Sequence, residues 1–301
     1  MPSYRQRLTA LCSRRHPFYS GCAQLANSRL IKLLSGTKPC NVWCRVPGGQ
    51  VLADLDDYVG RAAFFVGDLD RKITWICKKI VREGDTVLDI GANIGVVTVP
   101  LAKFVGKSRN VHSFEPNPSL AQQLNNTIAH NKLTNVHLHP VALGSRRDTL
   151  ELVIPEGNRG AASLVRQTIV KTAETVRVQV EMLDGLCEKE QIKSVRLIKI
   201  DVEGFETEVF KGAHELLSKI KPDAILFELN ERSSQELSEE PLMKLLHSYG
   251  YDFFSIPKNL LRMQLLPLNS RSKREVTGHD FLAVPKGEKF NEIARLVNAK
   301  K

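Results

Sequence analysis

The first 53 residues contain no aspartate or glutamate, although they carry eight arginines and lysines; the first acidic residue is Asp54. The formal net charge of the chain is +10. Subtracting these eight from the 43 basic residues leaves 35, against 33 acidic residues, for the rest of the chain. The positive charge is therefore concentrated in an N-terminal leader, and the nearly neutral body does not indicate a basic groove for nucleic acid.

Long apolar runs and paired cysteines are also missing. No run approaches the length of a membrane-spanning helix, and no hydrophobic signal region follows the first basic residues. The six cysteines lack C-x-x-C spacing, so a metal site is not expected, and reduced thiols favour a cytoplasmic location. The leader leaves three alternatives open: an organelle-targeting peptide, a segment lying on an anionic membrane, or a poorly ordered extension that ends in a capping helix.

One stretch organises the chain: a short aliphatic run ends at Asp89, and Gly91 and Gly95 follow, four residues apart. This pattern predicts a strand, a tight turn and a helix. Glycines let a ligand approach the backbone closely, and the helix start offers free N–H groups. Asn93 replaces the glycine that admits a pyrophosphate in dinucleotide sites, so a ligand without phosphates fits better. An ordinary turn without a ligand remains the alternative.

After this turn, strand-like and helix-like segments alternate, which predicts an α/β fold with a mainly parallel sheet. The second strand is expected over residues 110–114, and Glu115 follows it. Glu115 lies 20 residues after Gly95, near the place where nucleoside-binding folds put a carboxylate for a ribose. A solvated acid before a helix is the alternative. Residues 145–183 interrupt the alternation, so we expect a β-hairpin insertion there.

Five motifs occur in order along the chain. They are D-I-G-A-N-I-G from Asp89, F-E-P-N-P from Phe114, V-A-L-G from Val141, K-I-D-V-E-G from Lys199 and L-F-E from Leu226. Together they resemble the FkbM family of S-adenosylmethionine-dependent methyltransferases, over roughly residues 60–285. The resemblance implies a Rossmann-like class I methyltransferase sheet of seven strands, the last antiparallel, and methyl transfer to oxygen, often of a sugar or a secondary metabolite.

The charge distribution and the strand-like and helix-like segments, together with the resemblance, give domain boundaries, and the resemblance implies a cofactor site. We expect a basic leader (1–39), an N-terminal hairpin and helix forming a small β/α extension (40–83), the methyltransferase domain (84–287) and a C-terminal helix or tail (288–301). S-adenosylmethionine is the expected cofactor. Where the family commonly has Gly-x-x-Glu, this chain has Gly67-Asp68-Leu69-Asp70, which puts the role of that position in doubt. The residues implied to bind the cofactor are Asp89, Gly91, Ala92, Asn93, Gly95, Glu115, Asn117 and Ala142.

The K-I-D-V-E-G turn supplies two carboxylates, Asp201 and Glu203, expected at the same sheet edge as the glycine turn. Because a protonated hydroxyl is a weak nucleophile, a nearby carboxylate would help to remove its proton, and His279 is a second candidate base. Alternatively, the pair would hold Mg²⁺ together with Asp184 or Glu228, although no metal is predicted. A structural alternative has Asp201 capping the next helix and Glu203 in its first turn.

The leading hypothesis from the sequence is therefore an S-adenosylmethionine-dependent O-methyltransferase acting on a sugar, a glycan or another small metabolite. Methylation of RNA or another nucleic acid is an alternative, although no nucleic-acid partner is expected. A non-catalytic module that binds partners or a membrane through its basic leader is the third.

Overall fold

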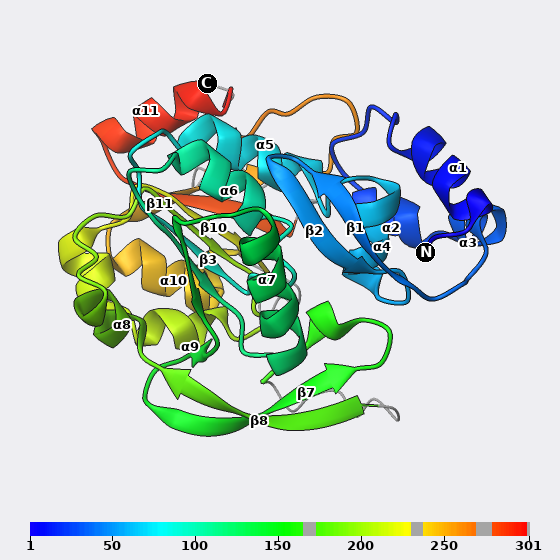
Figure 1. Cartoon of the computed structure of the whole chain (residues 1–301). Coiled ribbons are helices and arrows are strands. Elements are labelled where there is room, and N and C mark those ends of the chain that lie inside the picture. The colour runs from blue at the N-terminus through cyan, green and yellow to red at the C-terminus, as the bar shows by residue number, and fades with distance from the viewer. Residues whose placement is uncertain (165–172, 230–236, 269–278, 300–301) are drawn as a thin grey trace.

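A computed structural model of the 301-residue chain describes all residues except 165–172, 230–236, 269–278 and 300–301. Its centre is an eight-stranded sheet in the order β12-β11-β13-β10-β9-β3-β4-β5 (Figure 1). The strands are short, and all except the edge strands β5 and β12 are almost wholly buried, which explains their largely apolar sequences. Their bounds are β3 Val87–Ile90, β4 Val111–Phe114, β5 Val136–His139, β9 Leu197–Ile200, β10 Ile225–Glu228, β11 Tyr251–Ile256, β12 Leu266–Pro267 and β13 Asp280–Pro285.

The strand directions confirm the expected Rossmann-like methyltransferase sheet. β5, β4, β3, β9 and β10 are mutually parallel. The last strand, β13, runs antiparallel to both β10 and β11. β12 is a two-residue addition that pairs with β11 and was not expected from the sequence. The carboxyl ends of β3, β4, β9 and β10 therefore share one edge, where such folds bind ligands.

Helices cover both faces of the sheet because side chains alternate along each strand. Val87 of β3 packs toward α5, α6 and α11, whereas Leu88 and Ile90 pack toward α8, α9 and α10. A π-helical turn, Leu216–Ile220, and a 3₁₀ turn, Leu237–Glu239, complete the second layer. The helices on the two faces are α5 Arg71–Ile80, α6 Thr98–Val105 and α11 Glu288–Leu296, then α8 Leu183–Lys189, α9 Glu206–Lys211 and α10 Pro241–Ser248.

The N-terminal part of the chain packs beside this sandwich. An antiparallel hairpin, β1 Asn41–Val46 and β2 Gly49–Asp54, joins α4 Tyr58–Phe65 and lies against α7 Pro118–His130. Three helices fill the region that we expected to be a basic leader, and they pack on one another and on α4 (Figure 1). They are α1 Tyr4–Ser13, α2 Cys22–Asn27 and α3 Arg29–Ser35.

The interruption at residues 145–183 supplies two strands of a separate three-stranded sheet at the lower side of Figure 1. Its antiparallel pair is β7 Asp148–Pro155 with β8 Ala173–Glu181, and β6 Ala142–Leu143 adds a short parallel strand. A 3₁₀ turn, Arg159–Ala161, follows β7 and returns the chain to the domain. Residues 165–172, between this turn and β8, lie outside the described part.

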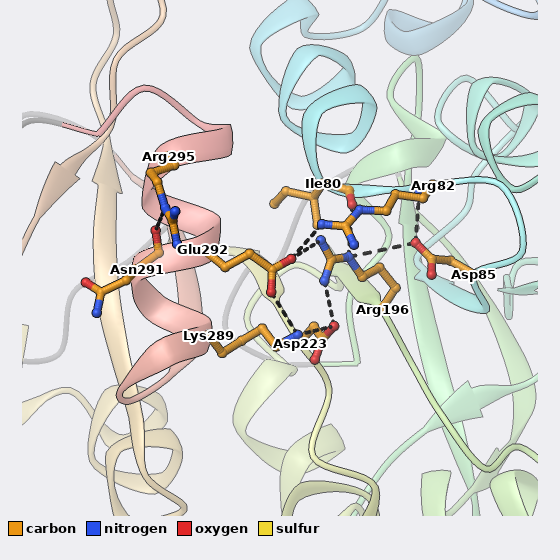
Figure 2. Close-up of polar contacts among 9 residues, drawn as sticks. All are labelled: Ile80, Arg82, Asp85, Arg196, Asp223, Lys289, Asn291, Glu292 and Arg295. Carbon is orange, nitrogen blue, oxygen red and sulfur yellow. Dashed lines mark hydrogen bonds and ion pairs between the residues drawn. The ribbon is translucent and has the colours of Figure 1, made fainter.

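An ion-pair network lies at the opposite, amino end of the strands (Figure 2). Arg196, which precedes β9, bonds to Asp223 at 2.6 Å and to Glu292 of α11 at 3.1 Å, and donates to the Ile80 carbonyl. The network thereby ties α5 and α11 to the strand entries. We call it the amino-end cluster; its members are Arg82, Asp85, Arg196, Asp223, Lys289 and Glu292.

Candidate functional site

The turn after β3 is shaped by backbone conformation and close packing. Gly91 has a φ of +77°, and a Cβ atom there would lie 1.9 Å from the carbonyl oxygen of Asp201. No side chain fits that position. Asn93 also has a positive φ, of +53°, and its own side chain accepts the Ile94 N–H. Asparagine tolerates this conformation better than most residues, which explains its presence in the turn.

Glu115 leaves the end of β4 and holds the glycine turn from the side. One carboxylate oxygen accepts the Asn93 N–H at 2.8 Å, and the other accepts the Asn117 N–H at 2.9 Å. Burial raises the pKa of Glu115 to about 7, although the two backbone hydrogen bonds act in the opposite direction. A carboxylate has about four acceptor positions, so two remain for a ligand. Glu115 is thus fixed in place with capacity to bind hydroxyls.

A cavity of about 270 Å³ opens at the carboxyl ends of β3, β4, β9 and β10, where the glycine turn, Glu115 and the β9 turn meet. The structure therefore brings together residues that we selected from separate motifs. Those that line the cavity are Gly91, Ala92, Asn93, Glu115, Ala142, Asp201 and Glu203.

Four of the selected residues do not line this cavity. Asp89 is fully buried behind the turn, where it accepts a hydrogen bond from Thr98 at 2.6 Å. A Cβ atom at Gly95 would lie 2.7 Å from the Leu124 side chain, so this glycine allows α7 to pack closely. Asn117 accepts the Ser119 N–H at the start of α7. His279 bonds through Nδ1 to the Leu229 carbonyl.

Lys199 connects the glycine turn to the carboxylates. Its Nζ donates to the Gly91 carbonyl at 3.0 Å and lies 3.7 Å from Asp89 and 3.9 Å from Asp201. Burial alone would lower the pKa of Lys199, but the negative charges of Asp201 and Asp89 have the larger combined effect, so the pKa is raised. Burial likewise raises the pKa of Asp89, and Lys199 opposes that rise. A buried cation therefore supports the turn from beneath.

The two carboxylates of the β9 turn face the cavity without capping the next helix. The Glu206 carboxylate accepts the Val202 N–H at 3.1 Å and the Gly204 N–H at 3.4 Å. These N–H groups belong to the turn that precedes α9, and no side chain caps the start of that helix, so the capping role considered for Asp201 is not observed. Glu203 adopts a φ of +52°, and its carbonyl accepts a hydrogen bond from Ser163 of the insertion. The β9 turn is therefore held by Glu206 of α9 and by Ser163 of the insertion.

A second charged group lines the cavity next to the β9 turn. Lys72 of α5 is almost fully buried and bonds to Asp70 at 2.7 Å and to Asp280 at 2.9 Å. Glu228, opposite Asp280 in the strand register, has a pKa raised to about 8, first by burial and then by Asp201 and Asp280. No sequence pattern indicated Lys72, because a lysine in the first turn of an amphipathic helix normally faces water. We call Asp70, Lys72, Glu228 and Asp280 the carboxyl-end cluster.

Comparison with known proteins identifies the family of this chain. The Methyltransferase FkbM domain matches residues 89–253. The 2-O-methyltransferase NoeI of Sinorhizobium fredii is 27% identical over 180 residues, 56% of this chain and 71% of NoeI. The 31-O-demethyl-FK506 methyltransferase FkbM of Streptomyces tacrolimicus is 25% identical over 57% of this chain and 75% of its own. The hexuronic acid methyltransferase AglP of Haloferax volcanii is 28% identical over 46% and 54%.

The chain belongs to the FkbM methyltransferase family. This finding confirms the expected family and the expected enzyme class, S-adenosylmethionine-dependent methyl transfer. The departure from the family pattern at Gly67 to Asp70 acquires a structural meaning. Asp70 begins α5 by accepting the Lys72 N–H, and the carboxylate also pairs with the Lys72 ammonium. The shorter acid at this position therefore contributes to the cavity wall together with Lys72.

The FkbM domain encloses its cavity with parts of the chain that lie outside the matched region. Ala23 and Gln24 of α2 line the cavity, as do Tyr58 and Val59 of α4. Within the matched region, Arg159 in the turn after β7 also lines the cavity. No pattern in the sequence pointed to these contacts, because each depends on two segments far apart along the chain.

The magnesium alternative finds no support in the described parts of the chain. Asp184, one of the ligands considered, accepts the backbone N–H groups of Glu215 and Leu216 and does not line the cavity. Across the described ranges, no three histidine, cysteine, aspartate or glutamate side chains are grouped so that they could hold a metal ion.

Proposed function

We propose that this protein transfers the methyl group of S-adenosylmethionine to a hydroxyl oxygen of a sugar or another small metabolite. One observation carries the proposal: a single cavity has a nucleoside-type turn on one side and several acidic side chains on the other. The names of NoeI, AglP and FkbM describe methyl transfer to a 2-O position, to a hexuronic acid and to 31-O-demethyl-FK506. They support an oxygen acceptor for this chain.

The cofactor side fits a nucleoside that carries an amino-acid tail. Glu115 would accept hydrogen bonds from the ribose hydroxyls, and Ala142 would flank the base. The backbone at Gly91 and Asn93 would lie beside the rest of the cofactor, which supplies an electrophilic methyl group on its sulfonium. Asp89 and Gly95 would act indirectly by fixing the turn, and Asn117 by fixing Glu115.

The acceptor side would orient a hydroxyl and remove its proton. Methyl transfer proceeds by in-line displacement, so the enzyme must mainly hold the acceptor oxygen close to the methyl carbon and in line. Asp201 and Glu203 would hydrogen-bond the acceptor, since both line the cavity. Glu228 suits the general base, because a base works best when its pKa is near the working pH. His279, which binds the Leu229 carbonyl outside the cavity lining, remains a weaker candidate.

The first test of the proposal is cofactor binding. S-adenosylhomocysteine should raise the melting temperature of the protein, because a ligand that binds only the folded state stabilises it. Glu115→Ala should abolish that rise, whereas Glu188→Ala, on the exposed surface of α8, should retain it. A wild-type protein whose melting temperature does not respond to high ligand concentrations would contradict the proposal.

The second test identifies the acceptor class. The protein is incubated with S-adenosylmethionine labelled in its methyl group and with a fractionated cell extract, and the label is followed into glycan, small-molecule, protein and nucleic-acid fractions. We expect base-stable label in the glycan or small-molecule fraction. Label confined to nucleic acid would replace the proposed acceptor by the alternative considered from the sequence.

A further inference from the structure

Exposed apolar side chains gather at the N-terminus. Ten large apolar residues in the described parts of the chain are exposed, and seven of them lie within residues 1–34. Single exposed leucines are ordinary on protein surfaces, but a contiguous group indicates an interaction site. The seven residues are Met1, Tyr4, Leu8, Leu11, Leu30, Leu33 and Leu34.

In α1 the exposed apolar residues form a stripe. Tyr4, Leu8 and Leu11 are spaced four and three residues apart, so they share one face of the helix. The opposite face, which includes Gln6 and Ala10, is buried against the protein. The helix therefore uses its polar and small residues to pack and presents its leucines to the outside, the reverse of an ordinary surface helix.

In α3 the same arrangement recurs. Ile31 and Ser35 are buried, whereas Leu30 and Leu33 are 61% and 72% exposed. The two helices lie side by side at one end of the molecule (Figure 1). Arg5 of α1 fastens them by donating hydrogen bonds to the carbonyls of Leu33 and Leu34. The leucines of α3 are thus held beside the first turn of α1 as part of one surface.

Basic side chains surround these leucines, and no acidic side chain is close in sequence. Positions 5 and 7 flank the apolar stripe of α1 on the helix surface, and positions 29 and 32 adjoin the leucines of α3. The first acidic residue is Asp54, beyond both helices and the hairpin. The exposed basic residues of this segment are Arg5, Arg7, Arg15, Arg29, Lys32 and Lys38.

We propose that α1 and α3 form a docking surface for an anionic phospholipid membrane. Apolar side chains framed by arginine and lysine match a lipid surface, where the leucines enter the acyl boundary and the cations meet phosphate headgroups. Nucleic acid fits less well, because exposed leucines add nothing to phosphate contacts or base stacking. No helix in the described ranges is long and apolar enough to cross a membrane, so the proposed contact is peripheral.

Helix α2 connects the proposed docking surface to the cavity. α2 lies between α1 and α3 in sequence, packs against α3 and α4, and contributes Ala23 and Gln24 to the cavity lining. A protein docked through α1 and α3 therefore holds one wall of its cavity near the lipid headgroups. The docking itself does not depend on the proposed methyl transfer and is tested without it.

The test is co-sedimentation of the full-length protein with vesicles of phosphatidylcholine alone or of phosphatidylcholine mixed with phosphatidylglycerol. We expect binding to the mixed vesicles that weakens as salt rises, because the headgroup attraction is screened. Leu30→Ser with Leu33→Ser should weaken binding at least about tenfold, since two exposed leucines no longer enter the lipid. Arg29→Gln with Lys32→Gln should weaken it by roughly tenfold or more.

Leu260→Ser with Leu261→Ser is the matched control, because it removes two exposed leucines outside α1 and α3. This variant should bind vesicles as the wild type does. All variants change exposed side chains, so an unchanged melting temperature would show that they remain folded. Equal binding of wild type and the Leu30/Leu33 variant, or no preference for anionic vesicles, would overturn the proposal. Self-association or RNA binding without vesicle binding would also overturn it.

Discussion

The two ends of the same sheet differ in the charge balance around their acidic side chains and in the direction in which the pKa values of these acids shift. In the amino-end cluster, three cations face three acids, and the partners of Glu292 lower its pKa to about 2 (Figure 2). In the carboxyl-end cluster, a single lysine faces three acids, and burial raises the pKa of Asp70 to about 6 and that of Glu228 to about 8. One end neutralises its charges, and the other retains an unbalanced excess of acid.

The opposite pKa shifts indicate different roles for the two clusters, one in stability and the other in the reaction. Carboxylates whose pKa values fall are stabilised by the fold, whereas carboxyl groups whose pKa values rise are held in an environment that disfavours their ionised form. Groups of the second kind gather at functional sites, where a titration near neutral pH is useful. The amino-end cluster should therefore hold the sheet and its helices together, and the carboxyl-end cluster should serve the reaction.

The largest expected effect is on stability at the amino end. Arg196→Met removes a nearly buried guanidinium that bonds to Asp223, Glu292 and the Ile80 carbonyl. Because Asp223 and Glu292 each lose one of their cations and the Ile80 carbonyl loses its buried donor, the free energy of unfolding should fall by about 3 kcal/mol. Urea denaturation measures this change. The affinity of the folded variant for S-adenosylhomocysteine should stay unchanged. A loss of affinity as well as stability would contradict the separate roles of the two clusters.

Arg82→Met is the matched control for that variant. Arg82 bonds to the same oxygen of Glu292 at 2.6 Å, but its side chain is 57% exposed. Water can replace this partner, so the expected loss is below about 1 kcal/mol. If both arginine variants lost equal stability, burial of Arg196 would not explain its contribution.

The next effect is on catalysis at the carboxyl end. If Glu228 is the base, Glu228→Gln should lower kcat/KM about a hundredfold. In the wild type kcat/KM should rise as the pH increases through about 8, because only the ionised carboxylate accepts a proton. The variant should lack this rise. Asp252→Asn, which changes an acid of β11 that is 44% exposed and does not line the cavity, should keep both the rate and the profile.

The pH dependence of the free energy of unfolding is a second test of Glu228→Gln, and the direction of the expected change follows from the pKa of Glu228. The pKa of Glu228 lies near 8 in the folded protein and near 4.5 in the unfolded chain, so between these values the folded state binds the extra proton. Stability from this group therefore falls as the pH rises through that window. Glu228→Gln should be more stable than the wild type above pH 8, by about 1 kcal/mol. A variant that is both less active and less stable there would indicate a structural role.

The sequence predicted the parts of this site that depend on local pattern. The run from Asp89 to Gly95 encodes a strand, a turn and a helix by adjacent residues, and the sheet with its antiparallel last strand followed from the resemblance to the family. The orientation of side chains around the turn was less accessible. Asp89 lies behind it, and Glu206 rather than Asp201 accepts the N–H groups of the β9 turn, because each outcome depends on packing within the folded layers.

Contacts between distant segments could not be predicted at all. Lys72 meets Asp280 across more than two hundred residues, and the amino-end cluster joins four separate segments of the chain. Each of these charged residues looks like ordinary solvated surface in its own segment. The contribution of α2 to the cavity is similar, since the acid-free composition of the leader indicated its charge but not where it packs.

A smaller effect should appear where the insertion meets the N-terminal extension. Arg159 bonds to Asp54 at 3.0 Å and lies 3.4 Å from Asp57, and it also lines the cavity. Arg159→Ala should release S-adenosylhomocysteine up to about tenfold faster, because two charge-assisted contacts that hold the turn over the cavity are lost. Stopped-flow displacement measures the rate. Arg147→Ala, which breaks the exposed pair with Glu181, should not change it.

The smallest expected effect is on the stability of Glu292→Gln. Its pH dependence tests whether acids at the two ends of the sheet affect stability in opposite directions. The pKa of Glu292 is lowered from 4.5 to about 2, so its contribution to stability is present above about 4.5 and is lost as the pH falls through 2. Glu292→Gln should cost no more than about 1 kcal/mol near neutral pH, because about a third of the side chain is exposed and its pairs are screened. Urea unfolding should show this cost shrinking on acidification and in high salt, whereas the gain from Glu228→Gln should shrink on acidification from above pH 8. Equal pH dependence in both variants would mean that the two ends of the sheet do not differ in how they hold their acids.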